Sequence, residues 1–485
     1  MPYTTFGLLE RLIILEIPRM HRILALLALG GVIALPGSTL KKNSQPDYSR
    51  FEKKLSKDQQ VLHAIDRLTF GPRPGDLEAA KKMGVKKWID RQLHPERLAE
   101  PANIPVEMVQ AKLYRAIYSN RQLEEVLVDF WYNHFNVDMN KGADRRLVPA
   151  YERDAIRPHV LGKFRDLLGA TAASPAMLFY LDNWQSVAPD QVRRPNGKRP
   201  TRGLNENYAR ELMELHTLGV DGGYTQKDVI EVARCFTGWT IDQPNVVGAF
   251  LYDDKTHDKG EKVVLGVVIP AGGGKDDGEK VLDILAQHPS TAKFISTKLA
   301  QRFVADDPPP ALIARMAKTF SDTDGDIRAV LAAMFQSREF FSQGAYRAKM
   351  KTPLEMIVSA VRVTGARVDS TAALVNQIAN LGQPLYRKLE PTGYSSANAE
   401  WVSAAALLGR MNFAMQLGRN RVQGVAVDAN RFSTIPAAAA RQVLYTEPSA
   451  ETLRAIGQAI PNPKRPPSGA VLAGLVMGSP DFQRR

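Results

Sequence analysis

The sequence contains a single cysteine, Cys235, among its 485 residues. One thiol cannot build an intrachain disulfide framework, and it cannot supply a zinc site made from several cysteines. The chain also lacks the H-E-x-x-H pattern of zinc proteases, the G-x-S-x-G pattern of serine hydrolases and the Glu-x-x-His pair of di-iron bundles. These absences exclude the enzyme classes that such local motifs identify.

Long apolar runs are also scarce. The run "ILALLALGGVIAL" (23–35) has 13 residues, which is too short to span a membrane comfortably. Met20-His21-Arg22 precede it and Pro36-Gly37-Ser38 follow it, which is the order of a secretory signal peptide. We predict a signal peptide over residues 1–39, with Met20 as an alternative start, and a periplasmic or extracellular protein. An N-terminal anchor helix is the alternative.

The rest of the chain has the composition of a globular protein. Hydrophobic residues make up 44% of the sequence, enough for a sizeable core. No composition break divides the chain after a linker at 40–60, so we predict one domain at 61–485 with a motif core at about 123–304. Most apolar runs have helical period, which predicts a mainly α fold with αα-hairpins. One small β-hairpin is expected near 246–268, with His257 and Asp258 in its loop or, alternatively, in an exposed polar turn.

The chain is strongly basic, with a net charge of +13 and a pI of about 9.6. Nucleic acid is the usual partner of such a chain, but predicted export argues against it. Basic residues are spread out except in "RRPNGKRPTRG" (193–203). This loop, which includes Arg202, is either a lid for an anionic substrate or polymer or a solvated surface loop.

A helix is predicted from residue 204 to 218, followed by a second helix after "GVDGG". The apolar stripe of the first helix consists of Leu204, Tyr208, Leu212 and Leu215. Gly219 suits a left-handed cap at its end. Thr225 and Asp228 have the spacing of a capping box that starts the second helix, which gives an αα-hairpin.

One carboxylate of the first helix falls on its apolar side. At 100° per residue, Glu211 lies inside the stripe, Asn207 and Glu214 lie beside it, Arg210 lies beyond them and His216 falls on the opposite flank. A buried carboxylate is costly unless it is paired, hydrogen-bonded or bound to a metal. The helix is therefore predicted to carry a polar cluster at the edge of a core.

Two further helices carry polar residues on apolar faces. In "LEEVLVDFWYNHFNV" (123–137), His134 continues the stripe four residues after Phe130. It is either a core histidine or a ligand or acid–base group. In the helix after "HPST", Lys298 lies between Phe294 and Ile295 with Arg302 nearby. These cations either extend along an apolar face, neutralise Glu211 or hold an anion.

Several of these motifs resemble a known family. They are "FWYNHFNV" (130–137), "NENYARELMELHTLGVDGGYTQKDVIEVARCFTGWT" (205–240), "HDKGEKVVLG" (257–266), "HPSTAKFISTKLAQRFV" (288–304) and the ending "GSPDFQRR". The chain resembles, from about Val61 to Arg485, the bacterial family called domain of unknown function 1800. The resemblance implies a usually exported, mainly helical protein, often encoded beside a second uncharacterised exported family. It departs at "EPTGYSSANAEW" (390–401), where Tyr394 follows Gly393 in place of the expected Gly-Trp pair.

Two hypotheses about function follow from these residues. The first is an enzyme that uses acid–base or metal-assisted chemistry on an anionic or envelope-associated substrate. Its catalytic pocket would be lined by Glu211, His134, Glu214, Asn207, Arg210, His257 and Asp258. Its ligand-binding residues would be Arg202, Asn205, Lys298 and Arg302. No cofactor is strongly implied, but a metal held by His134, Glu211 and His257 stays open.

The second hypothesis is a non-catalytic exported binding protein. The polar clusters would then be structural, and the basic surface would bind a second exported protein or an anionic polymer. Convergence of the motifs on one pocket favours the enzyme. Dispersal, with the charges paired locally, favours the binding protein.

Overall fold

The computed structural model describes residues 46–189, 203–460, 462 and 467–485. The predicted signal peptide and Arg202 of the basic loop lie outside these residues, so both stay predictions.

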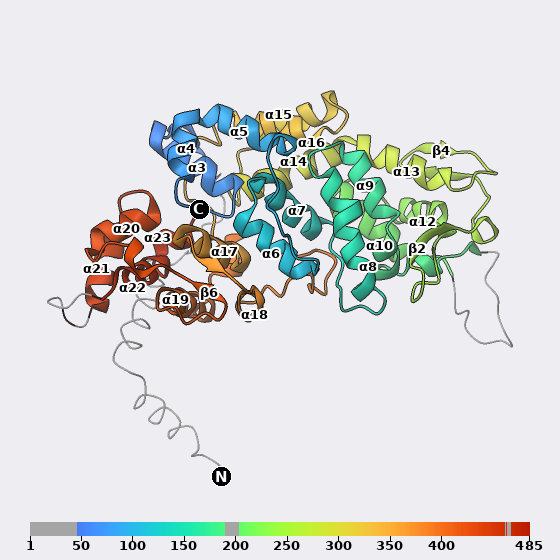
Figure 1. Ribbon diagram of the computed structural model, residues 1–485. Coiled ribbons are helices and arrows are strands. Elements are labelled where there is room, and N and C mark those ends of the chain that lie inside the picture. The colour runs from blue at the N-terminus through green and yellow to red at the C-terminus, as the bar shows by residue number, and fades with distance from the viewer. Residues whose placement is uncertain (1–45, 190–202, 461, 463–466) are drawn as a thin grey trace, which may run out of the picture.

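The described chain is mainly α-helical and elongated, as predicted for the fold class (Figure 1). The first helices are α3 (Lys57–Leu68), α4 (Asp76–Met83), α5 (Val85–Leu93), α6 (Met108–Tyr118) and α7 (Gln122–His134). The next are α8 (Asp144–Ala150), α9 (Phe164–Ala172), α10 (Pro175–Tyr180), α11 (Glu206–Glu211) and α12 (Gln226–Cys235). They are followed by α13 (Asp276–Gln287), α14 (Pro289–Phe303), α15 (Pro310–Asp322), α16 (Ile327–Phe335) and α17 (Pro353–Thr364). The last are α18 (Ala372–Asn380), α19 (Ala404–Gly418), α20 (Pro436–Leu444), α21 (Ala450–Ala459), α22 (Gly469–Met477) and α23 (Pro480–Gln483).

Strands are short and form hairpin-sized sheets. The antiparallel pairs are β1 (Trp239–Asp242) with β2 (Ala249–Tyr252), β3 (Lys262–Val264) with β4 (Val267–Ile269), and β5 (Arg367–Val368) with β6 (Val425–Ala426). The β element expected near 246–268 is thus present as two hairpins, because β2 and β3 each pair with a nearer neighbour in sequence. His257 and Asp258 lie in the connection between the two hairpins.

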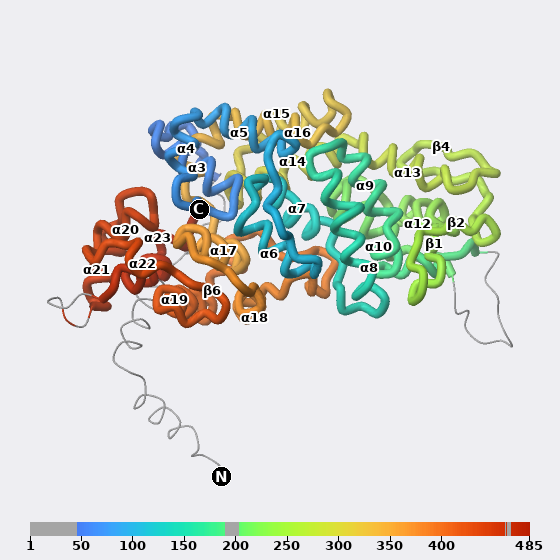
Figure 2. Tube along the Cα trace, in the orientation of Figure 1, coloured from blue at the N-terminus to red at the C-terminus, as the bar shows by residue number. Residues whose placement is uncertain are grey.

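Helix α17 lies near the N-terminal and C-terminal helices, and all of its residues are buried (Figure 1). Thr352 and Glu355 form its capping box, Pro353 occupies its first turn, and Gly365 ends it in the left-handed conformation with φ 60°. The N-terminal helices α3–α5 and the C-terminal helices lie at one end of the molecule, and the β1–β4 hairpins lie at the other (Figure 2). In the described ranges, no helix is both long and apolar enough to cross a bilayer.

The predicted αα-hairpin is present, but the helical phase changes within it. The chain continues from α11 into a π-helical turn, Leu212–Thr217, before Gly219 ends it with φ 83°. Bonds from i to i+5 widen the turn and shift every later residue around the axis. For this reason the predicted flank position of His216 is wrong: His216 is buried, whereas Leu215 is only half-buried.

Candidate ligand-binding site

His134 ends α7 in a largely aromatic environment. Its side chain is buried, and its Nε2 donates to the main-chain carbonyl oxygen of His216 at 3.0 Å. The other ring nitrogen, Nδ1, is buried and has no hydrogen-bond partner in the described part of the chain. Burial, followed by the nearby Lys298 ammonium, lowers the pKa of His134 well below its ordinary value. The imidazole is therefore neutral at physiological pH.

His216 shares this environment. Its ring centroid lies 5.1 Å from that of Phe135 and 6.3 Å from that of His134. Burial, with Lys298 as the second cause, lowers the pKa of His216 to about 3. The phase shift in the π-helical turn thus brings a second neutral histidine beside the first.

A cavity of about 310 Å³ opens beside His134. Its lining comes from the end of α7, from α14 and from the loop before α19. The lining residues are Phe130, Asn133, His134, Lys298, Gln301, Asp306, Thr392, Gly393, Tyr394, Ser395, Ser396 and Ala397. Two predicted site residues, His134 and Lys298, therefore share one pocket.

Lys298 is the unpaired charge of this pocket. Its ammonium lies 5.7 Å from the Phe294 ring centroid, and within the described residues it has no carboxylate at ion-pair distance and no hydrogen-bond acceptor. Burial lowers its pKa. The carboxylate in the lining, Asp306, is instead bonded to the Lys349 ammonium and to the Asn398 amide. The pocket therefore keeps a positive charge.

The loop at 390–401 forms one wall of the pocket. Gly393 has φ 68°, and a Cβ there would lie 2.1 Å from the main-chain oxygen of Asn133. The amide of Tyr394 donates to Asn133 Oδ1 at 3.2 Å. Asn136 donates to the carbonyl oxygens of Lys388 and Glu390, both at 2.9 Å. The "FWYNHFNV" motif is thus the surface on which this loop docks, and only glycine fits at 393.

Glu211 lies in a second polar cluster, on the surface of the α11–α12 hairpin. It is only half-buried, and its pKa is raised by burial and then by Glu214, while Arg210 opposes the shift. Glu214 accepts from the Tyr224 hydroxyl at 3.0 Å. Arg210 donates to Gln226 at 2.6 Å.

The polar residues at the start of this helix have structural positions. Asn205 is the N-cap of α11: its Oδ1 accepts from the Tyr208 amide at 3.1 Å, and its Nδ2 donates to the Leu181 carbonyl at 2.8 Å. Asn207 is exposed. Among the described residues, no hydrogen bond, ion pair or ring contact joins Glu211 to His134 or Lys298.

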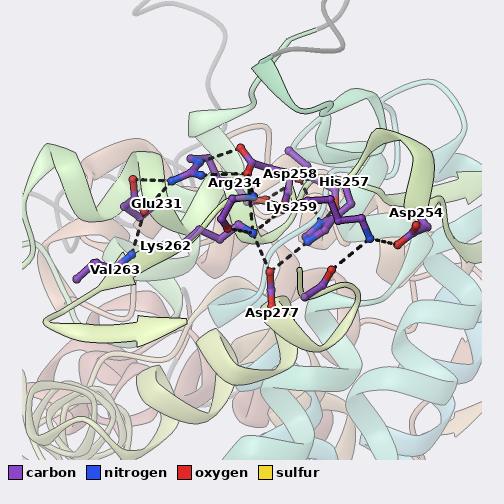
Figure 3. Close-up of polar contacts among 12 residues, drawn as sticks. Glu231, Arg234, Asp254, His257, Asp258, Lys259, Lys262, Val263 and Asp277 are labelled. Atoms are coloured by element: carbon purple, nitrogen blue, oxygen red, sulfur yellow. Dashed lines mark hydrogen bonds and ion pairs between the residues drawn. The ribbon is translucent and has the colours of Figure 1, made fainter. Parts of the chain in front are cut away.

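His257 and Asp258 lie in a third cluster, at the β hairpins (Figure 3). His257 Nδ1 donates to the Thr237 carbonyl at 2.8 Å, and Nε2 lies 3.2 Å from Asp277 Oδ2. Lys262 is fully buried and donates to Asp277 Oδ2 at 2.8 Å and to the carbonyl oxygens of Asp258 and Gly260.

The outer half of this cluster is an ion-pair chain. Asp258 accepts two hydrogen bonds from Arg234, at 2.8 and 3.0 Å, and Arg234 also binds Glu231. Burial acts to raise the pKa of Asp258, but the hydrogen bonds from Arg234 outweigh it and the pKa is lowered. Each charged side chain in the cluster therefore has a partner, so the cluster braces the two hairpins against α12 and α13.

Arg302 does not line the pocket. Its Nη2 instead lies 2.7 Å from Glu355 Oε1 in an interior ion pair. The proposed ligand-binding set is thus divided between the pocket (Lys298), a helix cap (Asn205) and an interior ion pair (Arg302).

The proposed metal ligands His134, Glu211 and His257 lie at three separate places. In the described residues, the set of three carboxylate or imidazole ligand atoms close enough to share an ion consists of Glu100, Glu124 and Glu125. Glu125 is already bound by Arg157 at 2.7 Å. These acidic residues were not identified from the sequence.

The family model described as "Protein of unknown function (DUF1800)" matches residues 63–484. The chain belongs to this family. No curated protein and no solved structure matches it. Membership confirms the resemblance carried by the sequence motifs, and the pocket is lined by two of them, at 130–137 and 288–304.

Sequence reasoning missed several partners at these sites. Asp277 is buried and contacts both His257 and Lys262. A signal was present: Asp277, Val281 and Leu285 lie at i, i+4 and i+8 on one face of α13. The wall residues Thr392, Ser395 and Ser396 gave no such signal, because they lie in a loop without periodicity.

Proposed function

We propose that this protein is an exported, non-catalytic binding protein that holds a small carboxylate- or phosphate-bearing ligand in the pocket beside His134. The observation that carries the proposal is the Lys298 ammonium, which faces this cavity with no counter-ion among the described residues. An anion would supply the missing charge, and burial makes such a pair stronger than one on the surface.

The neutral lining supports the same ligand class. Gln301 carries an amide group, and Thr392, Ser395 and Ser396 carry hydroxyl groups. These groups donate hydrogen bonds to ligand oxygens without adding charge. The volume of about 310 Å³ is at the lower end for ligand sites, which favours a small organic acid, a sugar phosphate or one terminal unit of an anionic polymer.

Binding is favoured over catalysis by the separation of the groups. The carboxylates suited to acid–base work, Glu211 and Glu214, lie on the α11–α12 surface. The free nitrogen of His134 is buried, so it is poorly placed to take a proton from a ligand. The role of His134 is to fix the end of α7 through its bond to the His216 carbonyl.

Binding can be tested by melting the mature protein with acetate, succinate, inorganic phosphate and glycerol phosphate. We expect at least one of these anions to stabilise the wild type and to have no such effect on Lys298→Met. Lys293→Met, which removes an exposed cation from the same helix, is the control and should respond like the wild type. Equal responses of Lys298→Met and the wild type to every anion would reject the pocket as the binding site.

Export is a separate part of the proposal. The charged residues before "ILALLALGGVIAL" and the small residues after it support cleavage near residue 40. N-terminal sequencing of the protein from the cell envelope or medium should begin between about 36 and 42. Recovery of an intact Met1 from the cytosol would contradict export while leaving the pocket proposal untouched.

A further inference from the structure

The protein interior next to helix α17 contains a group of buried cationic side chains. All are buried, with exposed fractions of 6% or less. They are Arg67, Arg302, Lys349, Lys351, Arg410 and Arg485. They come from α3, α14, the segment before α17, α19 and the C-terminal "QRR", so the fold brings distant parts of the sequence together here.

Glu355 is the common neighbour of this group. Its Oε1 lies 2.7 Å from Arg302 Nη2 and 3.0 Å from Arg485 Nη2, while its Oε2 accepts from the Thr352 amide. The same carboxylate acts electrostatically on Arg67, Lys351 and Arg410. One buried carboxylate therefore interacts electrostatically with five cations.

The charges do not balance. Among the described residues, Asp66 and Asp306 are the other carboxylates with a leading electrostatic effect on the group, so six cations face three such side-chain anions. Counting the α-carboxylate of Arg485 still leaves an excess of positive charge. The strain is visible in lowered pKa values, about 9 for Arg67 and about 8 for Lys351, with burial as the largest cause of each.

The hydrogen bonds do not balance either. In the described part of the chain, seven guanidinium nitrogens of this group are buried and have no partner. They are Nε and Nη1 of Arg67, Nη1 of Arg302, Nε and Nη2 of Arg410, and Nε and Nη1 of Arg485. Such donors are rarely left unpaired in protein interiors.

Another buried arginine, Arg362, has a hydrogen-bond acceptor for its guanidinium nitrogens. Arg362, also on α17 and 1% exposed, donates to the carbonyl oxygens of Gly71 and Ile117, both at 2.6 Å, and to Asp76 at 3.3 Å. No nitrogen of Arg362 is left without a partner. The Glu355 group is therefore not how this protein ordinarily buries arginine.

We infer that the Glu355 group binds a tetrahedral oxyanion, inorganic phosphate or sulfate, inside the protein. Such an ion would balance the excess positive charge, because it is negative. Its oxygens would also accept hydrogen bonds from several of the unpaired N–H donors at once. The site adjoins the proposed pocket, whose lining residue Asp306 bonds to Lys349 of this group, and it ties the C-terminal residues to α3, α14 and α19.

The test is direct chemical analysis of the full-length mature protein, purified in chloride buffer. Ion chromatography after acid denaturation should recover about one equivalent of phosphate or sulfate per chain, and the two ions are resolved from each other. Adding back millimolar amounts of either ion to stripped protein at matched ionic strength should raise its melting temperature.

Variants separate this site from its alternatives. Arg410→Met conserves volume and should lose the bound ion and its effect on melting. Arg153→Met, at an exposed pair with Asp154, and Lys298→Met, in the proposed pocket, should both keep the ion. If wild-type protein releases no oxyanion, and if phosphate and sulfate stabilise it no more than Arg410→Met, the group holds only water and the inference is overturned. Failure of Arg410→Met to fold leaves the wild-type analysis decisive.

Discussion

The pocket beside His134 and the cluster around His257 are built from the same residue types but use them differently. In the His257 cluster, the Lys262 ammonium has three acceptors, and the Asp277, Asp258 and Glu231 carboxylates all have cationic partners. In the pocket, the Lys298 ammonium has no anionic partner within the part of the chain that the structure describes. The comparison teaches that a polar residue on an apolar face marks a structural network when its bonding capacity is used up, and a binding site when it is not.

The largest effect should come from opening the paired cluster. Lys262→Met leaves the buried Asp277 carboxylate without its ammonium partner, so we expect a loss of about 3–5 kcal/mol in the free energy of unfolding, measured by chemical denaturation. Lys259→Met, which removes an exposed pair with Asp254, should cost less than about 1 kcal/mol. Equal losses would show that the cluster does not brace the hairpins.

Lowering the pH should reduce the stability of the folded protein, because His216 is buried and neutral. The pKa of His216 is about 3 in the folded protein against an ordinary 6.5, so between these values the unfolded chain binds a proton that the folded chain does not. Stability contributed by neutral His216 is therefore fully present above about pH 6.5 and falls as the pH is lowered, by up to about 1.4 kcal/mol per pH unit. His216→Met should flatten the stability profile between about pH 6 and 4. An unchanged slope would contradict a buried, neutral His216.

The docking of the pocket wall should be sensitive to one methyl group. Gly393→Ala combines a positive φ with a Cβ 2.1 Å from the Asn133 oxygen, so we expect a loss of about 1–3 kcal/mol and impaired anion binding. Gly223→Ala is the matched control, because Gly223 has φ 88° but open space around its Cβ position. It should lower stability by about 1 kcal/mol without affecting the pocket. If both variants bind anions like the wild type, the 390–401 loop is not a wall of the site.

Much of the fold could be predicted from periodicity and caps. The capping box at Thr225 and Asp228, the left-handed Gly219 and the stripe of Val229, Val232 and Ala233 are all present. The π-helical turn could not be predicted, because a helical wheel assumes a constant angle per residue. That single change reversed the expected positions of Leu215 and His216.

The candidate site was only partly predictable for a related reason. His134 and Lys298 were identified because each interrupts an apolar stripe on its own helix. The loop residues Gly393 and Tyr394 complete the pocket by contacting Asn133 on α7. Asn133 and Tyr394 are more than 250 positions apart in sequence. Local pattern contains no information about that contact, nor about the ion pair of Arg302 with Glu355.

The smallest expected effect concerns Glu211. It is half-buried and has a raised pKa, so its ionised form is slightly disfavoured in the folded protein. Glu211→Gln should leave the free energy of unfolding unchanged or raise it by less than about 1 kcal/mol at neutral pH. Glu206→Gln perturbs the hydrogen bond from Gln226 to Glu206, so its free energy of unfolding should be equal to or slightly lower than that of Glu211→Gln. A loss of several kcal/mol at Glu211 would reveal a buried cationic partner that the geometry does not contain.

The central claim is that the pocket at Lys298 binds an anion. Its most direct test is competitive acetylation of lysines as a function of pH, measured by mass spectrometry. Because Lys298 has a lowered pKa and faces a cavity, it should react at lower pH than the exposed Lys293 on the same helix, and saturating amounts of the anion that stabilises the wild type should protect it. Lys262, enclosed by its three acceptors, should stay unlabelled in the native protein. If Lys298 is as unreactive as Lys262, or if its labelling is indifferent to every anion tested, the pocket is not an anion-binding site and the distinction between the two clusters fails.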